Sequence, residues 1–408
     1  MANAINAGDT AWVLVCCSLV LLMTPALGFF YGGMVRRKNL LSTLTLSYTF
    51  MALIGVQWLL FGYSLSFGED IGGIIGGLNF VGFMGVGAAP SPHYGTTIPQ
   101  TVFASFQMMF AVITPALITG AFVERVNFKS FLIFSLVWAT LVYDPLCHWV
   151  WGKGGWLANL GVLDFAGGTV VHIAAGFSAL AFALAIGPRK GYGAVPLEPS
   201  NIPFTVLGAG LLWVGWFGFN AGSALAANGV AGNALLTTNT SGAAAGLVWM
   251  LLSWLDGRPS TLGLATGMVV GLAAITPASG YVTPLAALVI GAVAAPLSYY
   301  AIRFRQNLGW DESLDVWACH GMASTWGMLA AGLFATLGVN EAGGNGLFYG
   351  NPAQLGVQAL AMVVTMVYSF GITYALAKAL DWSLGLRVTT MEEEVGLDIS
   401  AHGERAYS

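Results

Sequence analysis

The sequence predicts an all-α polytopic membrane protein with eleven transmembrane helices, its amino terminus outside the cell and its carboxyl terminus in the cytoplasm. Of the 408 residues, 57% are hydrophobic and only 8% are charged, whereas about 25% of the residues in a soluble domain are charged. The chain also divides into eleven apolar stretches, each near the roughly 20 residues that cross a hydrocarbon core. Its few basic residues fall almost entirely on one side of the predicted membrane.

The first half of the chain holds five apolar stretches. The basic run Arg36–Lys38 follows the first of them, which therefore predicts a retained helix and not a cleaved signal peptide, whose basic residues would come first. The second stretch is followed by Gly68–Pro99, which we expect to be a loop because charges and prolines interrupt it. Arg125 and Lys129 separate the third stretch from the fourth. The five predicted helices cover about residues 10–35, 41–67, 100–123, 130–151 and 165–187.

The second half of the chain holds six apolar stretches. Arg189 and Lys190 precede the first of them, Arg258 follows the second, and Arg303 and Arg305 follow the fourth. Basic residues thus mark every second connection, as expected when alternate loops return to the cytoplasm. The six predicted helices cover about residues 203–225, 235–255, 260–278, 281–302, 314–338 and 354–380.

The basic residues also determine the predicted orientation, because cytoplasmic loops hold most Lys and Arg side chains of membrane proteins. With the amino terminus outside, only Lys153 of the 14 basic residues lies on the outer side. An odd number of spans permits an inverted repeat of five plus five helices with one additional C-terminal helix. In support of a repeat, Asp164 and His172 open the fifth stretch, and Asp315 and His320 open the tenth.

The chain is expected to have two parts. A transmembrane domain covers residues 1–385, and a polar cytoplasmic tail covers residues 386–408 with the acidic run Glu392–Glu394. The tail is too short to bury a core of its own. The net charge of −4 and the lack of a dense basic block argue against a nucleic-acid partner.

Two histidines stand in apolar runs, where ionisable residues are costly and are usually functional. If Asp164 marks the outer end of the fifth helix and Asp311 the inner end of the tenth, His172 and His320 lie about 12 and about 13.5 Å from opposite surfaces. In a core of about 30 Å they meet near the midplane. Because desolvation disfavours the charged form, we expect neutral imidazoles that hydrogen-bond to each other and offer their other nitrogens to a small polar solute.

A zinc site is the rival use of these imidazole nitrogens. His148 and Asp144 could be recruited to such a site. However, the usual metal-binding spacings, two histidines at i and i+4 or paired cysteines, are absent from the sequence. We therefore expect neither a metal nor a cofactor.

Aromatic side chains form a second group of candidates. Residues at i and i+4 share a helix face, and the faces of Trp and Phe rings attract a cation by about 0.5–2 kcal/mol. A hydroxyl group beside them can accept a proton of that cation. Phe106 and Phe110 share a face of one helix in this way, as do Trp216, Phe219 and Ser223 on another. Trp151 is a further aromatic candidate, at the outer end of the fourth stretch.

Four motifs resemble signature sequences of the Amt/Mep family of ammonium transporters, and they occur in the family's order. The resemblance is to the bacterial and archaeal Amt type and favours this branch over the Rhesus branch. It continues into the tail, where Gly385–Arg387, Gly396–Asp398 and His402–Tyr407 also match. The four motifs are Gly28–Arg36, Asp164–His172, Gly215–Ser223 and Thr276–Tyr281.

The resemblance implies roles for individual polar residues. His172 and His320 look like the family's twin pore histidines. Asp164 resembles its essential aspartate, which supports the outer vestibule and is implicated in deprotonation. Asp144 is a departure, because an apolar residue is usual at that position.

The resemblance implies roles for the aromatic residues as well. Phe110 and Phe219 look like the family's stacked phenylalanine gate. Phe110, Trp151 and Ser223 resemble its outer site for ammonium recruitment. The residues that flank the pore are then Phe106 and Trp216.

The resemblance further implies a homotrimer with one pore per subunit in the cell membrane (the inner or plasma membrane). The family is not enzymatic, and it takes ammonium or ammonia, with methylammonium as an analogue. Its cytoplasmic tail takes part in control by PII-type nitrogen regulators.

Together, the residues and the resemblance predict a transport mechanism. NH4+ binds at the outer aromatic site, loses a proton near Asp164 and passes as NH3 between Phe110 and Phe219 to the two imidazoles. Because a bare cation in the membrane core is costly and K+ has no proton to lose, this route selects for ammonium. Whether the proton follows the ammonia is left open. The alternatives are an ammonium sensor (transceptor) that conducts little and a membrane metalloenzyme that uses the histidines.

Overall fold

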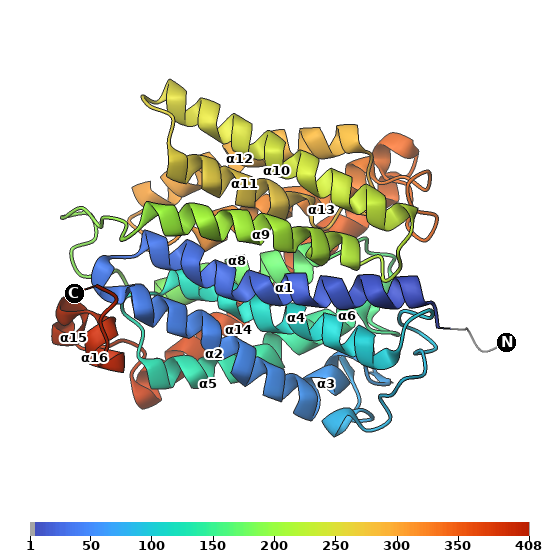
Figure 1. Cartoon of the computed structure of the whole chain (residues 1–408), viewed down its shortest axis with the longest axis horizontal. Helices are drawn as coiled ribbons and strands as arrows, with labels where there is room; N and C mark the ends of the chain where they lie inside the picture. The colour runs from blue at the N-terminus through green and yellow to red at the C-terminus, as the bar shows by residue number, and fades with distance from the viewer. Residues whose placement is uncertain (1–4, 408) are drawn as a thin grey trace.

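The computed structural model describes residues 5–407, so residues 1–4 of the predicted transmembrane domain and Ser408 of the predicted tail lie outside it. Long helices run side by side along the molecule, and the first and last described residues lie at opposite ends of this bundle (Figure 1). An odd number of membrane crossings requires this separation of the termini. The end that carries the carboxyl terminus is the end predicted to face the cytoplasm.

Each of the five apolar stretches in the first half forms a helix. In three of them, part of the helix changes from α to the wider π hydrogen-bonding pattern, in which each N–H reaches one residue further back. The helices are α1 (Ala7–Met34); α2 (Leu40–Gln57) with the π segment η2 (Trp58–Gly62) and α3 (Tyr63–Phe67); α4 (Gln100–Ile118) with the 3-10 turn η4 (Thr119–Ala121); α5 (Phe128–Trp138) with the π segment η5 (Ala139–Tyr143) and α6 (Asp144–Trp151); and the π segment η6 (Gly168–Ile173) with α8 (Ala174–Ile186).

The six apolar stretches of the second half are helical too. Only one of them contains a π segment, and it lies in the position that corresponds to η6. The helices are α9 (Ile202–Gly222), α10 (Gly229–Leu255), α11 (Thr261–Ile275), α12 (Pro284–Asn307), the π segment η7 (Trp317–Met322) with α13 (Ala323–Phe334), and α14 (Pro352–Leu384).

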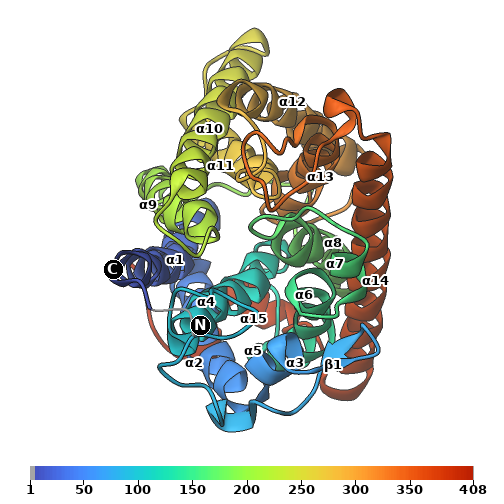
Figure 2. The ribbon, with the colours of Figure 1, turned by 90° about the vertical axis from the view of Figure 1, so that its right-hand side faces the viewer.

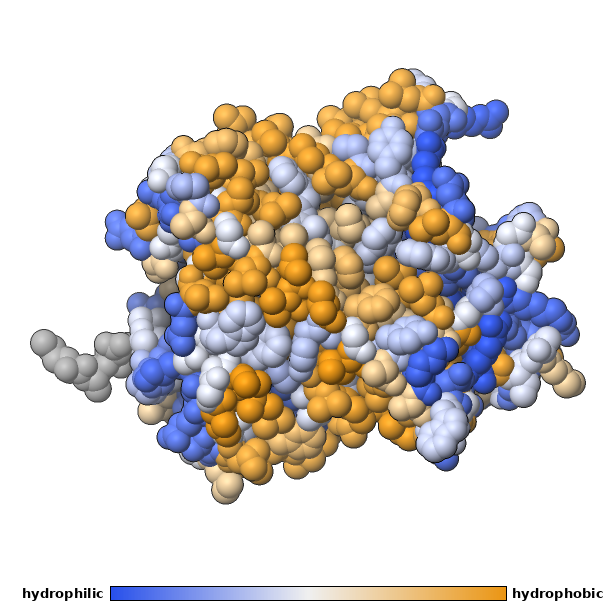
Figure 3. All heavy atoms as spheres, turned by 180° about the vertical axis from the view of Figure 1, so that it is seen from behind, coloured by the Kyte–Doolittle hydropathy of each residue, from blue (hydrophilic) through white to orange (hydrophobic). Residues whose placement is uncertain are grey.

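Nine helices in residues 5–407 are long and apolar enough to cross a membrane. Of the other two predicted spans, α11 has 15 residues, and the tenth joins the 6 residues of η7 to the 12 of α13. Eleven crossings therefore remain a prediction. The surface supports a membrane location: in Figure 3, a broad band of hydrophobic atoms covers the middle of the molecule, and hydrophilic atoms gather at both ends.

The predicted loop Gly68–Pro99 has little regular structure. It contains a hairpin of two short antiparallel strands, β1 (Asp70–Ile71) and β2 (Ile75–Gly76), and the 3-10 turn η3 (Val81–Phe83). Three further short elements lie in other connections. They are the 3-10 turns η1 (Arg37–Asn39) and η8 (Leu347–Tyr349) and the helix α7 (Trp156–Asn159).

The first helices of the two halves, α1 and α9, pack along each other (Figure 2). Glycines on one face of α9 allow this contact. A Cβ atom at Gly208 would lie 2.4 Å from the backbone nitrogen of Phe30, and one at Gly215 would lie 2.2 Å from Cγ of Met23. Small residues bring helices together in the same way throughout membrane proteins. The fifth helices of the two halves also meet, through η6 and η7, as expected of two structural repeats.

The tail folds back onto the end of the bundle. Its helix α16 (Leu397–His402) lies beside η1 and the start of α2, and α15 (Thr390–Val395) packs against α16 (Figure 1). The backbone N–H of Leu397 donates to Oδ1 of Asn39 at 2.8 Å, and the backbone N–H of Ser42 donates to Oδ1 of Asp398 at 2.8 Å. The tail is thus docked through specific hydrogen bonds and not through a core of its own.

Candidate functional site

Two imidazole rings are in contact at the centre of the bundle. His172 on η6 and His320 on η7 are each 2% exposed, and their Nδ1 atoms lie 3.2 Å apart. The rings are nearly parallel, with centroids separated by 5.2 Å. The structure thus brings together the two histidines that the sequence placed near the midplane.

The hydrogen bond between the two Nδ1 atoms restricts the protonation of both rings. In a neutral pair, one Nδ1 must donate and the other must accept. The donating ring then has a bare Nε2, and the accepting ring carries its proton on Nε2. The pair therefore offers one acceptor and one donor to a solute. Nε2 of His172 is buried without a hydrogen-bond partner in residues 5–407.

Two glycines allow the histidine-bearing segments to approach each other. A Cβ atom at Gly176 in α8 would lie 2.3 Å from the backbone nitrogen of Gly321 in η7. Because the obstruction is backbone, no side-chain rotation relieves it. The contact between the imidazoles depends on this crossing.

We expect Gly176→Ala to lower the thermal unfolding midpoint, since overpacking a core costs about 1–3 kcal/mol. The matched control is Gly210→Ala in α9, where nothing lies within 4 Å of an added Cβ. In the control, a Gly to Ala change inside a helix is neutral or stabilising by roughly 0.5–1 kcal/mol. Thermal scans of the purified variants in detergent measure the difference. Equal midpoints for the two variants would contradict the proposed role of the crossing.

Asp164 fixes the start of η6. Its carboxylate accepts hydrogen bonds from the backbone N–H groups of Gly167, Gly168 and Thr169 at 2.9, 2.6 and 2.8 Å, and a further one from the Thr169 hydroxyl. Burial raises the pKa of Asp164, and these hydrogen bonds act in the opposite direction by stabilising the carboxylate. The side chain thus points toward the first turn of the helix that carries His172.

Glu312 has the corresponding place in the second half, and the sequence interpretation missed it. Its carboxylate accepts from the backbone N–H groups of Val316 and Trp317 at 2.8 and 3.0 Å. The interpretation that paired Asp315 with Asp164 was wrong. Asp315 instead receives a hydrogen bond from Nη2 of Arg305 at 2.6 Å.

The signal that would have identified Glu312 is its spacing from the histidine. Glu312 precedes His320 by the same eight residues that separate Asp164 from His172. Burial raises the pKa of Glu312 to about 7, with the nearby Arg305 charge opposing the shift. The two halves therefore share one device, a buried carboxylate that caps a π segment.

The two phenylalanine rings of the predicted gate lie against each other above the histidines. The centroids of Phe110 on α4 and Phe219 on α9 are 4.2 Å apart, and Phe219 is 5.9 Å from the ring of His172. Trp151 stands perpendicular to Phe110 at 5.9 Å, and its indole N–H donates to the backbone carbonyl of Asp164 at 2.9 Å. Asp164 thus positions both Trp151 and η6.

The remaining predicted residues surround this stack. The hydroxyl of Ser223 donates to the carbonyl of Phe219 at 2.9 Å. The ring of Phe106 packs against Phe110 with centroids 5.0 Å apart. Trp216 stacks on His172 at 5.4 Å, and its N–H donates to the hydroxyl of Thr276 at 2.9 Å. All of the predicted aromatic and histidine residues thus form one continuous group.

Two cavities adjoin the histidines. The narrower one has a volume of about 10 Å³, close to the roughly 10–15 Å³ that a single water molecule needs. A wider one of about 80 Å³ leads from His320 toward the carboxyl-terminal end, past Tyr31 and Asp315. Apart from the two histidines, the narrow cavity is lined by Met23, Leu27, Ile113, Leu117, Val171, Leu212, Trp216 and Phe219.

Asp144 and His148 do not join this group. Asp144 is fully buried and accepts hydrogen bonds from the amide of Gln57 at 2.8 Å and the hydroxyl of Ser66 at 3.4 Å. His148 uses both ring nitrogens elsewhere, on the Ser66 carbonyl and on Asp70. Within residues 5–407, no group of three or more His, Cys, Asp or Glu side chains is arranged to hold a metal ion. These positions do not support the alternative of a shared zinc site.

The sequence is similar to those of known ammonium transporters. The sequence profile of the Ammonium Transporter Family matches residues 11–407. The chain is 51% identical to the ammonium transporter Amt1 of Archaeoglobus fulgidus over 401 residues, covering 98% of this chain and 99% of the relative. It is 47% identical to the ammonium transporter of Bacillus subtilis, covering 98% of each chain.

Solved structures agree with this comparison. The crystal structure of Mep2 from Candida albicans superposes with a TM-score of 0.89 at 34% identity, covering 95% of this chain and 88% of the other. The structure of a sensor Amt protein superposes with a TM-score of 0.88 at 30% identity, covering 97% of this chain and 98% of the other.

Proposed function

Because the chain belongs to the ammonium transporter family, we propose that it recruits NH4+ at its outer aromatic site, removes one proton and conducts NH3 past the phenylalanine gate to the paired imidazoles. The observation that carries this proposal is the narrow cavity beside His172 and His320. Its volume of about 10 Å³ matches one molecule of the size of water or ammonia. An ion that keeps its hydration shell does not fit.

The proposed recruitment site combines two rings and a hydroxyl. The perpendicular rings of Phe110 and Trp151 present π electrons to a cation. The Ser223 hydroxyl donates its proton to the Phe219 carbonyl, so the lone pairs of its oxygen are left to accept an N–H of ammonium. These contacts return only a few kcal/mol, less than desolvation of the cation costs. The cation is therefore held outside the gate until it loses a proton.

We assign the proton loss to the vestibule near Asp164. Within the pore, the Nε2 atoms of the two imidazoles supply one acceptor and one donor. Neutral ammonia can both donate and accept, so it matches this pair, whereas a bare K+ ion provides no donor. The same hydrogen bond between the Nδ1 atoms offers a route along which the released proton could follow, so electroneutral and electrogenic transport are both compatible with the site.

We further propose that the protein is a homotrimer in the inner or plasma membrane and acts as a transporter and not as an enzyme. Residues 386–408 would form a cytoplasmic regulatory tail on which a PII-type regulator acts. The helices α15 and α16 of the tail are docked at the end of the bundle toward which the wider cavity leads, and this position supports such control. A second candidate function is that of an ammonium sensor that conducts little, and the structural similarity of this chain to the sensor Amt protein favours it.

Uptake of methylammonium into proteoliposomes tests the proposal. We expect His172→Ala with His320→Ala to reduce uptake by roughly 10- to 100-fold, since a solute loses its buried hydrogen-bond partners. The control is His93→Ala, whose ring lies in the outer loop and contacts Lys153. Uptake that persists in the double variant would overturn the role of the histidines. Ammonium binding without uptake in the wild-type protein would favour the sensor.

A further inference from the structure

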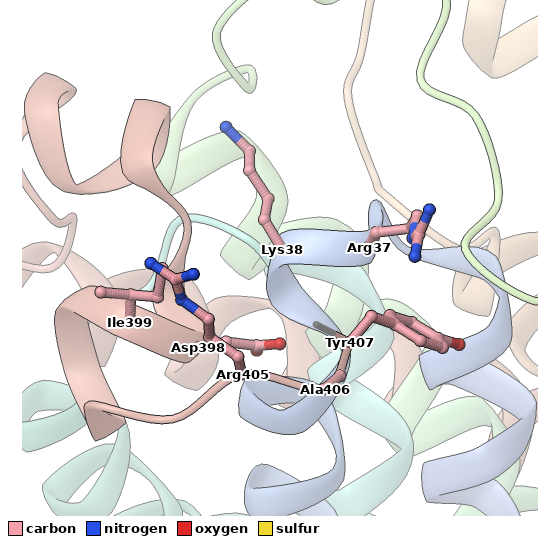
Figure 4. Close-up of a pocket in the computed structure, with 7 residues that line it drawn as sticks. All are labelled: Arg37, Lys38, Asp398, Ile399, Arg405, Ala406 and Tyr407. Carbon is pink, nitrogen blue, oxygen red and sulfur yellow. The ribbon is translucent and has the colours of Figure 1, made fainter.

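A pocket of about 300 Å³ opens at the end of the bundle that carries the carboxyl terminus. It lies between η1, α16 and the last described residues, and it is separate from the pore. Figure 4 shows Arg405 on one side of the pocket and Arg37 on the other, with the ring of Tyr407 next to Arg37. The residues that line the pocket are Arg37, Lys38, Asp398, Ile399, Arg405, Ala406 and Tyr407.

The pocket has a surplus of positive charge. Three of its side chains are cationic and only Asp398 is acidic. Asp398 is 2% exposed, and its Oδ1 already accepts the backbone N–H of Ser42. Lys38 directs its ammonium group to the carbonyl of Glu393 at 2.9 Å. The charged groups left for a ligand are therefore the guanidinium groups of Arg37 and Arg405.

These two arginines differ from most others in the chain. Among residues 5–407, the guanidinium groups of Arg37 and Arg405 have no carboxylate within 4.0 Å and donate no hydrogen bond to another residue. Six other arginines form ion pairs with carboxylates: Arg36, Arg125, Arg189, Arg303, Arg305 and Arg387.

Tyr407 holds the pocket in shape. The guanidinium carbon of Arg37 lies 4.5 Å above the centre of its ring. The hydroxyl of Tyr407 accepts a hydrogen bond from Nδ2 of Asn201 at 3.1 Å, which ties the end of the tail to the start of α9. A guanidinium group that is stacked on a fixed ring loses less conformational freedom when it binds a ligand.

We propose that this pocket binds a phosphate-bearing anion between Arg37 and Arg405. A guanidinium group presents two parallel N–H donors that match the oxygens of a phosphate, and its charge shortens and strengthens both hydrogen bonds. The volume is at the lower end of the roughly 300–1,000 Å³ of small-molecule sites. It is enough for a phosphorylated small molecule or for the headgroup of an anionic lipid, which share this chemistry.

The position of the two arginines gives the site a consequence. Arg37 belongs to the turn after α1, whereas Arg405 belongs to the tail. An anion held by both therefore bridges the tail and the bundle. Because it binds only when both parts are in place, it stabilises the docked tail by mass action. The site is independent of the pore residues, so it does not rest on the proposed transport mechanism.

In the full-length protein, the rate at which a protease removes the tail measures how firmly the tail is docked, and therefore reports binding of the anion. One arm titrates inorganic phosphate into the detergent-solubilised protein, against chloride at matched ionic strength. The other compares nanodiscs of phosphatidylcholine with nanodiscs that also contain phosphatidylglycerol. Protection in the phosphate arm identifies a soluble ligand, and protection only with the anionic lipid identifies a headgroup. Either result supports the proposal.

Variants connect the protection to the two arginines. We expect Arg37→Gln and Arg405→Gln each to weaken the apparent affinity by roughly 10-fold, as for loss of a hydrogen-bonded charge. The apparent affinity of Arg405→Lys should lie between those of the wild type and Arg405→Gln, because lysine keeps the positive charge but not the two parallel N–H donors. The control is Arg258→Gln, which changes an arginine in the loop after α10. Absence of protection in both arms, or equal protection in all variants, would overturn the proposal.

Discussion

Replacing Asp164 with Ala is expected to abolish methylammonium uptake and to destabilise the protein by at least about 3 kcal/mol. The substitution leaves the backbone N–H groups of Gly167, Gly168 and Thr169 without their acceptor. A buried donor that loses its partner costs about 1–3 kcal/mol. The first turn of η6 would loosen, and His172 would shift relative to His320.

Asp164→Asn separates the positioning role from a role in proton transfer. Asparagine keeps the shape and one acceptor oxygen but not the negative charge. If Asp164 only positions η6, uptake and the thermal midpoint should fall together and by less than in Asp164→Ala. If the charge also acts on the substrate, uptake should fall while the midpoint changes little. The control is Asp256→Asn, which alters an exposed ion pair with Arg303 of the kind that contributes little to stability. Normal uptake by Asp164→Ala would contradict both roles.

The helices and the central histidines are features that the sequence could predict. Apolar stretches have to be helical in a membrane, because an exposed backbone cannot be satisfied there. The two lone histidines stood out because little else in those stretches can ionise. Their contact was harder to predict, since η6 and η7 begin at Gly168 and Trp317, later than the prediction assumed.

The remaining features depend on three-dimensional contacts. The close crossing at Gly176 brings the imidazoles together despite the later helix starts. Nothing in residue order distinguishes this glycine from the others. Asp315 was mistaken for the partner of Asp164 because it is the aspartate nearest to His320. It has a left-handed backbone with φ of 60°, as Gly167 has with φ of 105°, so its true counterpart is the turn glycine and not the capping carboxylate.

Replacing Arg189 with Met is expected to destabilise the end of the bundle that carries the carboxyl terminus by about 3 kcal/mol, the lower part of the range for breaking a buried ion pair. Arg189 donates to Glu124 at 2.9 Å and to Asp311 at 2.8 Å, and both carboxylates are fully buried. The loss of stability is limited because each carboxylate keeps one arginine: Arg36 lies 3.0 Å from Glu124, and Arg125 lies 4.0 Å from Asp311. Thermal unfolding in detergent measures the change. The control Arg303→Met breaks an exposed ion pair, and an equal effect there would contradict the prediction.

The pH dependence of this variant gives a sharper test. Burial tends to raise the pKa of both carboxyl groups. The charges of Arg189 and Arg36 and the hydrogen bonds from Arg36 outweigh it and hold the pKa of Glu124 below its usual value. The hydrogen bonds and charge of Arg189 and the charge of Arg125 do the same for Asp311. In the wild type, their contribution to stability is therefore present above the unfolded pKa and is lost as the pH falls through the folded one. Without Arg189 each folded pKa rises toward its unfolded value, so the variant should gain less stability than the wild type as the pH rises from about 4 toward neutrality. Adding Glu124→Gln and Asp311→Asn removes both titrating groups, so the pH dependence that they contribute to stability should disappear.

The same substitution should also loosen the tail, because the network around Arg189 extends to it. Glu124 accepts from Nδ2 of Asn39 at 3.0 Å, and Oδ1 of Asn39 accepts the backbone N–H of Leu397. The network also extends from Arg189 toward the histidine segment. Arg189 binds Asp311, and the next residue, Glu312, caps the segment that carries His320. We expect faster proteolysis of the tail in Arg189→Met than in Arg303→Met. If the tail stays protected while the bundle loses stability, the network transmits nothing to the tail. If both change together, one buried arginine links tail docking to the stability of the bundle.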